Sequence, residues 1–196
     1  MDEAELRAKG ERLRHYFFAG RNYERADLRN KDLRGINFAC SNFRGADLSG
    51  ADLRGAILLC ADLSRACLHK ANLEGADLCG ADMTNSYCKA ANFNKAVMWH
   101  TVMKGTICKN ATFFETDMVG LDMARAEMLG ARFDGANTEG VRNIDRAIFY
   151  WFFNPVMHGK PVYDPFPGAV PMDQSNVGSY SFQENSGRGQ SGLDYL

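Results

Sequence analysis

Residues 46–55 read ADLSGADLRG and residues 76–80 read ADLCG, three copies of a five-residue unit that continues with substitutions from Arg21 to Gly140. Counted by the third residue of each unit, here called the centre, the chain holds 24 consecutive units between Tyr23 and Thr138. The centre is large and apolar in nearly every unit, and the residue two positions before it is mostly Ala, with some Ser or Thr. These two positions are predicted to be interior, and the other three carry nearly all the charge.

A period of five matches neither regular secondary structure. An amphipathic helix repeats its apolar residues every 3.6 positions, and a half-buried strand repeats them every two. Similar units at a fixed period are instead typical of a solenoid, in which stacked units share one continuous core. The period therefore predicts a repeat architecture.

The unit resembles the motif of the pentapeptide-repeat family, in which a small residue precedes Asp or Asn, then Leu or Phe, then two polar residues or Gly. This resemblance covers residues 21–140 and implies an all-β, right-handed quadrilateral β-helix with four pentapeptides per coil and about six coils. Residues 20 apart would then stack, and the sequence agrees, because Cys88 falls beside Cys108 and one column collects only Leu and Phe. That column reads Leu33, Leu53, Leu73, Phe93, Phe113 and Phe133.

The segment before the repeats reads as a cap. An open solenoid has unpaired ends that invite edge-to-edge growth, so natural solenoids are capped. Asp2 and Glu5 form a helix-start pattern, and Leu6, Leu13 and Phe17 can share one helical face. Residues 1–20 are therefore predicted to be an N-terminal capping region, with a helix over residues 2–19.

The segment after the repeats divides in two. Residues 141–154 are predicted to contain a short hydrophobic capping helix, since Ile148 begins an apolar run that Pro155 ends. This helix is too short to span a bilayer, which needs about 20 apolar residues. Residues 155–196 hold all five prolines and much Gly, Ser, Asn and Gln without any period, which predicts an extended arm.

Composition favours a cytoplasmic protein with reduced thiols. No signal peptide and no long apolar run is present, so membrane insertion is not expected. Six cysteines occupy repeat positions without CxxC or Cys/His ligand spacing, and we expect them to act as small hydrophobic residues rather than as metal ligands. No cofactor is expected.

No catalytic residues are assigned. The chain lacks G-x-S-x-G, a phosphate-binding glycine loop and HExxH, and its many Asp residues recur at the one position where the motif places them. The four histidines are scattered in sequence and in repeat phase. We therefore expect a binding or structural protein rather than an enzyme.

One face of the expected coil is apolar on its outside. This fourth face has Leu58, Leu78 and Met98 among its centres, and the residue after each centre should point outward. On the other three faces that column carries charges, whereas here it is charge-free from Ala39 to Val119. Exposed contiguous apolar surface usually marks a contact, and Trp is typical of interface hot spots. The predicted protein-binding residues, here called the apolar stripe, are Leu59, Cys79, Trp99 and Val119, widened by Ile57 and Val97.

The sequence is compatible with three different contacts at the stripe. The chain's own arm could cover it, or it could contact a second copy or a foreign protein. The C-terminal aromatic cluster has a similar ambiguity, because it could cap the last coil or, as in related family members, make a dimer contact. This cluster comprises Phe149, Tyr150, Trp151 and Phe152.

We expect a non-enzymatic protein-binding or structural assembly component, a rigid rod that contacts partners through the stripe and the arm. Its partners would be proteins, as a homo-oligomer or in a larger assembly such as a virion. The alternative is a Qnr-like DNA mimic that modulates type II topoisomerases and protects them from quinolones. Such mimicry needs a strongly negative surface, but residues 21–140 hold 15 Lys and Arg against 15 Asp and Glu. The same neutrality argues against direct binding of nucleic acid.

Overall fold

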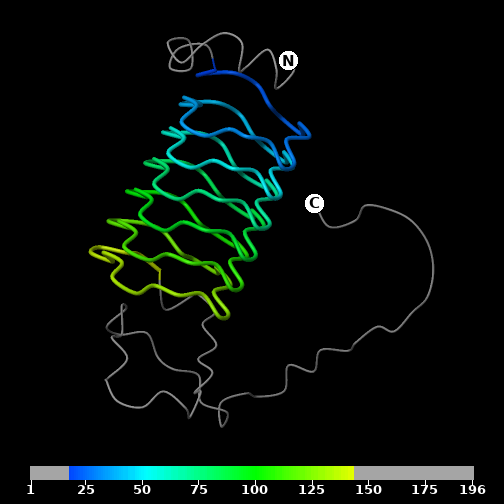
Figure 1. Ribbon diagram of the computed structural model, residues 1–196. Coiled ribbons are helices and arrows are strands. Elements are labelled where there is room, and N and C mark those ends of the chain that lie inside the picture. The colour runs from blue at the N-terminus through cyan, green and yellow to red at the C-terminus, as the bar shows by residue number, and fades with distance from the viewer. Residues whose placement is uncertain (1–17, 144–196) are drawn as a thin grey trace, which may run out of the picture.

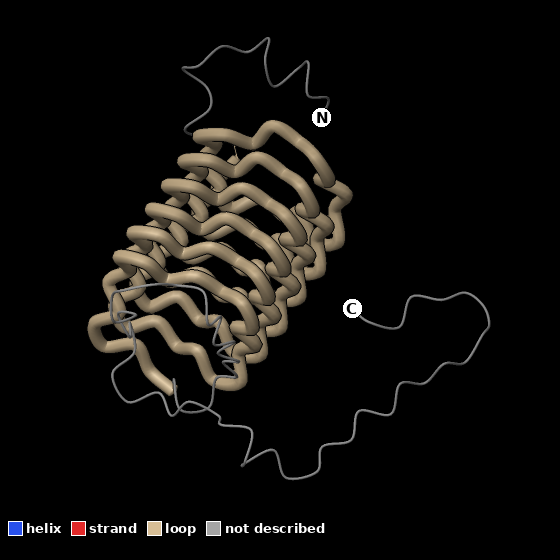
Figure 2. Tube along the Cα trace, turned by 60° about the horizontal axis from the view of Figure 1, so that its bottom comes forward, coloured by secondary structure: helices blue, strands red, loops and turns tan. Residues whose placement is uncertain are grey.

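The computed structural model describes residues 18–143, which form a rod of stacked coils (Figures 1 and 2). The residue before each centre pairs in parallel with the residue 20 positions later, as in the series Asn22, Asn42 and Asp62. These pairings continue to Arg142. Each coil therefore takes four pentapeptides, which confirms the spacing implied by the resemblance. The described residues contain no helix, and each strand is a single bridging residue.

Each pentapeptide forms one side of the coil. The first face comprises residues 21–25, 41–45 and so on in steps of 20. The second, third and fourth faces begin at residues 26, 31 and 36 and repeat in the same steps. The centre points inward, and the residues before and after it lie on the outside. This alternation is that of a short extended strand.

Backbone hydrogen bonds run from coil to coil on every face. On the fourth face, the N–H of Leu58 donates to the carbonyl oxygen of Asp77 at 2.7 Å, and the N–H of Ile57 donates to that of Ile36 at 3.0 Å. The first two bonds thus join a unit to the coils on either side. The Asp or Asn before the centre adds a local bond, since Asp47 Oδ1 accepts from the N–H of Ser49 at 3.0 Å.

The corners explain the last two positions of the motif. The N–H of Ala46 donates to the carbonyl oxygen of Phe43 at 2.9 Å, closing a turn, and the second residue after each centre has a positive φ. The third residue of a type II turn must have a positive φ, and Gly adopts that conformation most easily. Residues other than Gly also occupy this position, including Arg25 and Lys70. At Gly50 the absence of a side chain also matters, because a Cβ there would collide with the Asn30 side chain one coil earlier.

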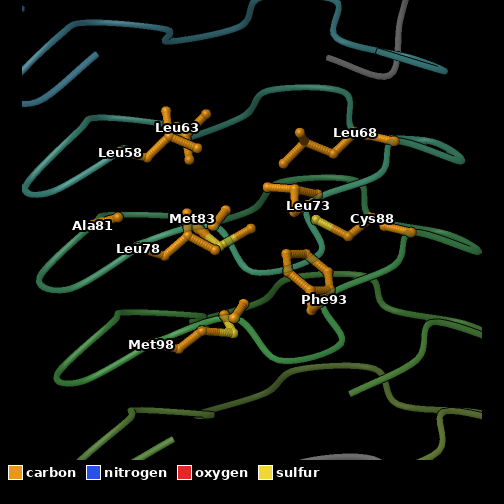
Figure 3. Packing of buried hydrophobic residues seen from close by; sticks show 14 of the residues in the cluster. Leu58, Leu63, Leu68, Leu73, Leu78, Ala81, Met83, Cys88, Phe93 and Met98 are labelled. Atoms are coloured by element: carbon orange, nitrogen blue, oxygen red, sulfur yellow. The ribbon is translucent and has the colours of Figure 1, made fainter. Parts of the chain in front are cut away.

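The core fills the inside of the rod. The centres from Phe43 to Met123 are fully buried, and they form columns of like residues seen in Figure 3, where Leu58 lies above Leu78 and Met98. Burial of a Leu, Phe or Met side chain contributes roughly 1.5–3 kcal/mol. Both interior positions predicted from the sequence are confirmed as buried over most of the rod.

Two details tie the core together across coils. Phe113 stacks between Phe93 and Phe133, with ring centroids 5.0 and 4.9 Å away and ring planes within 5° of parallel. Where Thr replaces Ala at the small interior position, its hydroxyl donates to a carbonyl of the preceding coil, as Thr101 does to Leu78 at 2.8 Å. Buried hydroxyl groups are thereby satisfied.

The ends of the rod lie slightly outside the predicted bounds. Phe18 and Ala19, which the sequence assigned to a helix, instead continue the coil, and Ser41 donates to the Phe18 carbonyl at 2.9 Å. Arg142 still pairs with Asp122 at the other end. The remainder of the two predicted capping helices and the whole predicted arm lie outside the described residues.

Candidate protein-binding surface

The apolar stripe runs parallel to the rod axis along the fourth face. Leu59, Cys79, Trp99 and Val119 each follow a centre, so they take the same place in four successive coils. The coil step is about 4.8 Å, the distance between paired strands. Ile57 and Val97 lie on the other side of the buried centres Leu58 and Met98.

Exposure is concentrated at two of these residues. Trp99 is 47% exposed and Leu59 is 40% exposed, and these are two of the three exposed large hydrophobic residues among residues 18–143. Cys79, Val119, Ile57 and Val97 are half-buried. The structure thus brings all six predicted residues onto one face, with the large side chains Trp99 and Leu59 projecting farthest into solvent.

Two carboxylates alternate with the apolar residues of the same face. Asp77 pairs through its backbone with Ile57 on one side and Val97 on the other, and Val97 pairs in turn with Asp117. The stripe is therefore charge-free in the column after the centres but acidic in the column before them. The sequence prediction named Ile57 and Val97 and overlooked the two Asp residues, although the period of 20 would have placed them.

Both carboxylates accept hydrogen bonds from neutral groups. Asp77 Oδ1 accepts from the N–H of Cys79 at 3.0 Å, and Asp117 Oδ1 accepts from Asn137 Nδ2 at 3.1 Å. Neither forms an ion pair with a cation of residues 18–143. The fourth face contains no Lys or Arg between residues 36 and 140, so both negative charges remain uncompensated there.

The chemistry of Cys79 reflects this environment. Burial raises the pKa of the Cys79 thiol to about 11, and hydrogen bonding to Asp77 together with the charges of Asp77 and Asp117 adds to the rise. A negative neighbour disfavours a thiolate. The stripe therefore holds a protonated, weakly nucleophilic thiol and not a reactive one.

On the other three faces, most carboxylates are paired with arginine or lysine. Arg29 lies 2.7 Å from Asp27 and 3.7 Å from Asp47 in the next coil. The side-chain hydrogen bond from Arg29 is the main reason that the pKa of Asp27 falls to about 2. Lys109 contacts Glu127 at 2.9 Å on the same face. Outside the fourth face, much of the negative charge is locally neutralised.

Two aromatic residues outside the stripe were not predicted as site residues. Tyr87, on the second face, is 38% exposed and lies 6.0 Å from the ring of His69. Phe114, on the third face, is covered by the Arg132 guanidinium, 4.6 Å above its ring. Their positions in the unit could have revealed them. Tyr87 pairs through its backbone with Cys67 and Ile107, so it lies in a short apolar column of its own, whereas the neighbours of Phe114 are polar or charged.

The other predicted features give a simpler picture. Phe149, Tyr150, Trp151 and Phe152 lie outside the described residues. Residues 18–143 contain no group of three His, Cys, Asp or Glu side chains arranged to hold a metal ion. All six cysteines are free. Within the same part of the chain, no helix has the length and apolar character needed to cross a membrane.

Comparison with known proteins identifies the repeat. A family model described as pentapeptide repeats matches in eight copies, over residues 24–55, 46–85 and 81–120. A pentapeptide repeat protein from the thylakoid lumen of Arabidopsis thaliana is 28% identical with a TM-score of 0.50; the match covers 50% of this chain and 69% of that one. Such structural neighbours imply a right-handed β-helix. No curated protein sequence gives a significant match.

Two further solved structures share the fold more loosely. Rfr23 of the cyanobacterium Cyanothece 51142 is 20% identical with a TM-score of 0.33, and the match covers 63% of this chain and 90% of Rfr23. QnrB1, a plasmid-mediated fluoroquinolone resistance protein, is 19% identical with a TM-score of 0.19, and the match covers 64% of this chain and 90% of QnrB1. At these values neither likeness carries an argument about activity.

Proposed function

The chain belongs to the pentapeptide-repeat family, and we propose that it is a non-enzymatic protein-binding component that contacts its partner through the apolar stripe. The observation that carries this proposal is the exposure of Trp99 and Leu59 on a face without Lys or Arg. The other three faces of the rod all carry Lys or Arg.

Exposed apolar groups in contiguous arrangement favour a contact. Burial of Trp99 and Leu59 by a partner would remove from water the two side chains that project most from the stripe. Trp is enriched among the residues that dominate interface energies. The fully packed core beneath them holds both residues on a rigid support, which lowers the entropy cost of binding.

The rod also suits a subunit of a larger assembly formed in the cytoplasm, including a virion. In this proposal the arm over residues 155–196 ties neighbouring subunits together, since its Pro-rich composition favours an extended segment. The stripe then makes the rigid contact and the arm a second one. Two linked contacts raise the overall affinity without requiring either to be strong.

The charge distribution does not favour a DNA mimic of type II topoisomerase substrates. A mimic needs a continuous negative field. Here carboxylates such as Asp27 and Glu127 are paired with Arg29 and Lys109. The unpaired Asp77 and Asp117 are interleaved with apolar residues.

The test is quantitative capture of partners from the native source by full-length protein and by the variant Leu59→Asp/Trp99→Asp. The control is Arg44→Asp/Lys89→Asp, which alters two exposed residues at the same position of the unit on the first and second faces. The control changes the net charge more than the stripe variant does. Circular dichroism should show that all three proteins are folded.

We expect the partner or self-association to be lost with the stripe variant and kept with the control. A chain ending at Asn154, tested in the same way, shows how much the arm contributes to partner binding. Equal recovery with all variants would refute the role of the stripe. Recovery of gyrase or topoisomerase IV as the specific partner would instead favour the DNA-mimic function.

A further inference from the structure

We propose that the stripe binds a cationic amphipathic α-helix of another protein, lying along the rod axis with basic residues seven positions apart. This inference rests on the proposed function, because it names the partner of the same surface. It is carried by the charge, the spacing and the hydrogen bonding of the fourth face.

The charge of the face favours a basic partner. Asp77 and Asp117 lie beside Val97 and have no ion pair with residues 18–143, and the face offers no Lys or Arg. An apolar partner without positive charge would bring both carboxylates into a drier environment without compensation, which is costly. Lys or Arg would pair with the carboxylates and could also lie over the exposed ring of Trp99.

The spacing of the face fits a helix. Asp77 and Asp117 are two coils apart, about 9.6 Å at the step of paired strands. Seven residues of an α-helix rise about 10.5 Å and return to the same side. Basic residues seven apart would therefore meet the two carboxylates, and apolar residues between them would meet Val97 and Trp99.

The backbone of the rod argues against an added strand. A strand joins a sheet through unpaired edge groups. On this face the N–H groups of Leu58, Asp77 and Cys60 donate to carbonyl oxygens of neighbouring coils, at 2.7 to 3.0 Å. A partner on the side of the rod must therefore be recognised by side chains, as a helix in a groove is.

The two longer segments outside residues 18–143 are not net basic, so they match the acidic face less well than a cationic helix does. Residues 155–196 contain Lys160 and Arg188 but four acidic residues, so their side chains carry a net charge of −2. Residues 1–17 place Arg7 and Arg14 seven positions apart, but their four basic residues are balanced by four acidic ones. The fourth face of a second copy would repel the first, since it carries the same two unpaired carboxylates.

The test uses full-length protein with Trp151→Phe, which leaves Trp99 as the single tryptophan. Three blocked helical peptides are titrated while Trp99 fluorescence is recorded. The first has two lysines seven positions apart with two leucines between them, the second has glutamates in place of the lysines, and the third has its lysines five positions apart. Only the first presents two positive charges and the leucines on one side.

The key variant is Asp77→Asn/Asp117→Asn, and its fold is expected to persist. Asn37 already occupies the same column and accepts from the N–H of Ala39 at 2.9 Å, which is the bond that Asp77 makes to Cys79. The control Asp62→Asn/Asp82→Asn changes the same position of the unit on the first face, where both carboxylates accept the equivalent bond.

We expect saturable binding of the first peptide, about tenfold weaker binding to the Asp77→Asn/Asp117→Asn variant, and weakening by salt. The control variant should bind as the parent does. The proposal is overturned if the glutamate peptide or the wrongly spaced peptide binds equally well, or if no peptide binds.

Other occupants would also overturn it. If acrylamide fails to quench Trp99 in the free full-length chain, a segment of the chain or a second copy already covers the stripe, and sedimentation velocity tells these apart. Failure of the proposed function is a separate result. A native partner that is lost with Leu59→Asp/Trp99→Asp but kept with Asp77→Asn/Asp117→Asn refutes the cationic helix and leaves the protein-binding role standing.

Discussion

Thr101 donates its hydroxyl hydrogen bond to the carbonyl oxygen of Leu78, 23 residues earlier and one coil away, at 2.8 Å. Thr106 and Thr116 make the same bond to Met83 and Phe93. The carbonyl of Leu78 also accepts from the N–H of Ala81 within its own turn. A small polar residue inside the rod thus links a corner of one coil to the next.

Replacing this hydroxyl should destabilise the rod. Thr101→Val keeps the shape but removes the donor, and we expect the free energy of unfolding to fall by about 1 kcal/mol. Denaturation by urea measures the change. The control is Thr84→Val at a half-buried corner, which should alter stability by less than about 0.5 kcal/mol. Equal losses at the two sites would contradict a specific role for the buried bond.

The phenylalanine column should tolerate Leu better than Ala. Phe113 is fully buried between Phe93 and Phe133, so Phe113→Ala should cost about 3–5 kcal/mol through lost contacts and a cavity. Phe113→Leu should cost less than half of that, because Leu73 fills the same column two coils earlier. Thermal and urea unfolding of both variants would check this. A Leu variant as unstable as the Ala variant would show that the ring stack itself determines stability.

Acid should weaken the pairing of Asp27 with Arg29. The pKa of Asp27 is lowered to about 2 in the folded chain, chiefly by the side-chain hydrogen bond from Arg29. A lowered folded pKa gives stability that is present above the unfolded pKa, about 3.8, and lost as pH falls toward 2. Asp27→Asn should therefore lower the melting temperature at pH 6, and this effect should shrink as the pH falls through 2.

The size of this pH effect should be small, because the pair is exposed to solvent and is screened by salt. The matched control is Asp62→Asn on the first face, where the carboxylate accepts the same backbone bond but has no ion pair with residues 18–143. A difference between Asp27→Asn and the parent protein that stays constant from pH 6 to pH 2 would rule out the ion pair as its cause.

The thiols should differ in reactivity. Cys79, whose pKa is raised to about 11 by burial and by Asp77 and Asp117, should alkylate more slowly at pH 8 than the exposed Cys40 and Cys60. Mass spectrometry after iodoacetamide treatment gives the rate at each residue. Asp77→Asn should speed alkylation of Cys79, whereas Asp62→Asn should leave it unchanged. Faster alkylation of Cys79 than of Cys60 in the parent protein would contradict the assignment.

The sequence predicted the inside of the rod well because the core demands it at every fifth residue. Leu58 and Leu78 were placed by the period, and their stacking followed from the coil size that the resemblance supplied. The corners were harder to predict. Arg25, Cys60 and Lys70 have a positive φ although none of them is Gly, so the sequence does not mark these turns. The repeated turn imposes this conformation on any residue at the second position after a centre.

The candidate surface was predicted only in part. Trp99 and Leu59 stood out because large apolar residues are unusual after a centre. Asp77 and Asp117 did not, because Asp before a centre is the ordinary motif residue and accepts the N–H two positions later. Their lack of a cation depends on the absence of Lys and Arg from the fourth face of the neighbouring coils, which a single unit does not reveal.

The twenty-residue coil has a consequence for how such a chain can change in length. Insertion of one pentapeptide would leave every centre in an interior position, so the core would survive. Yet each residue after the insertion would turn by one side of the coil. An extra unit between Cys79 and Trp99 would carry Trp99 and Val119 around a corner, away from Leu59. Folding tolerates steps of five, whereas the continuity of a surface along the rod tolerates only steps of twenty.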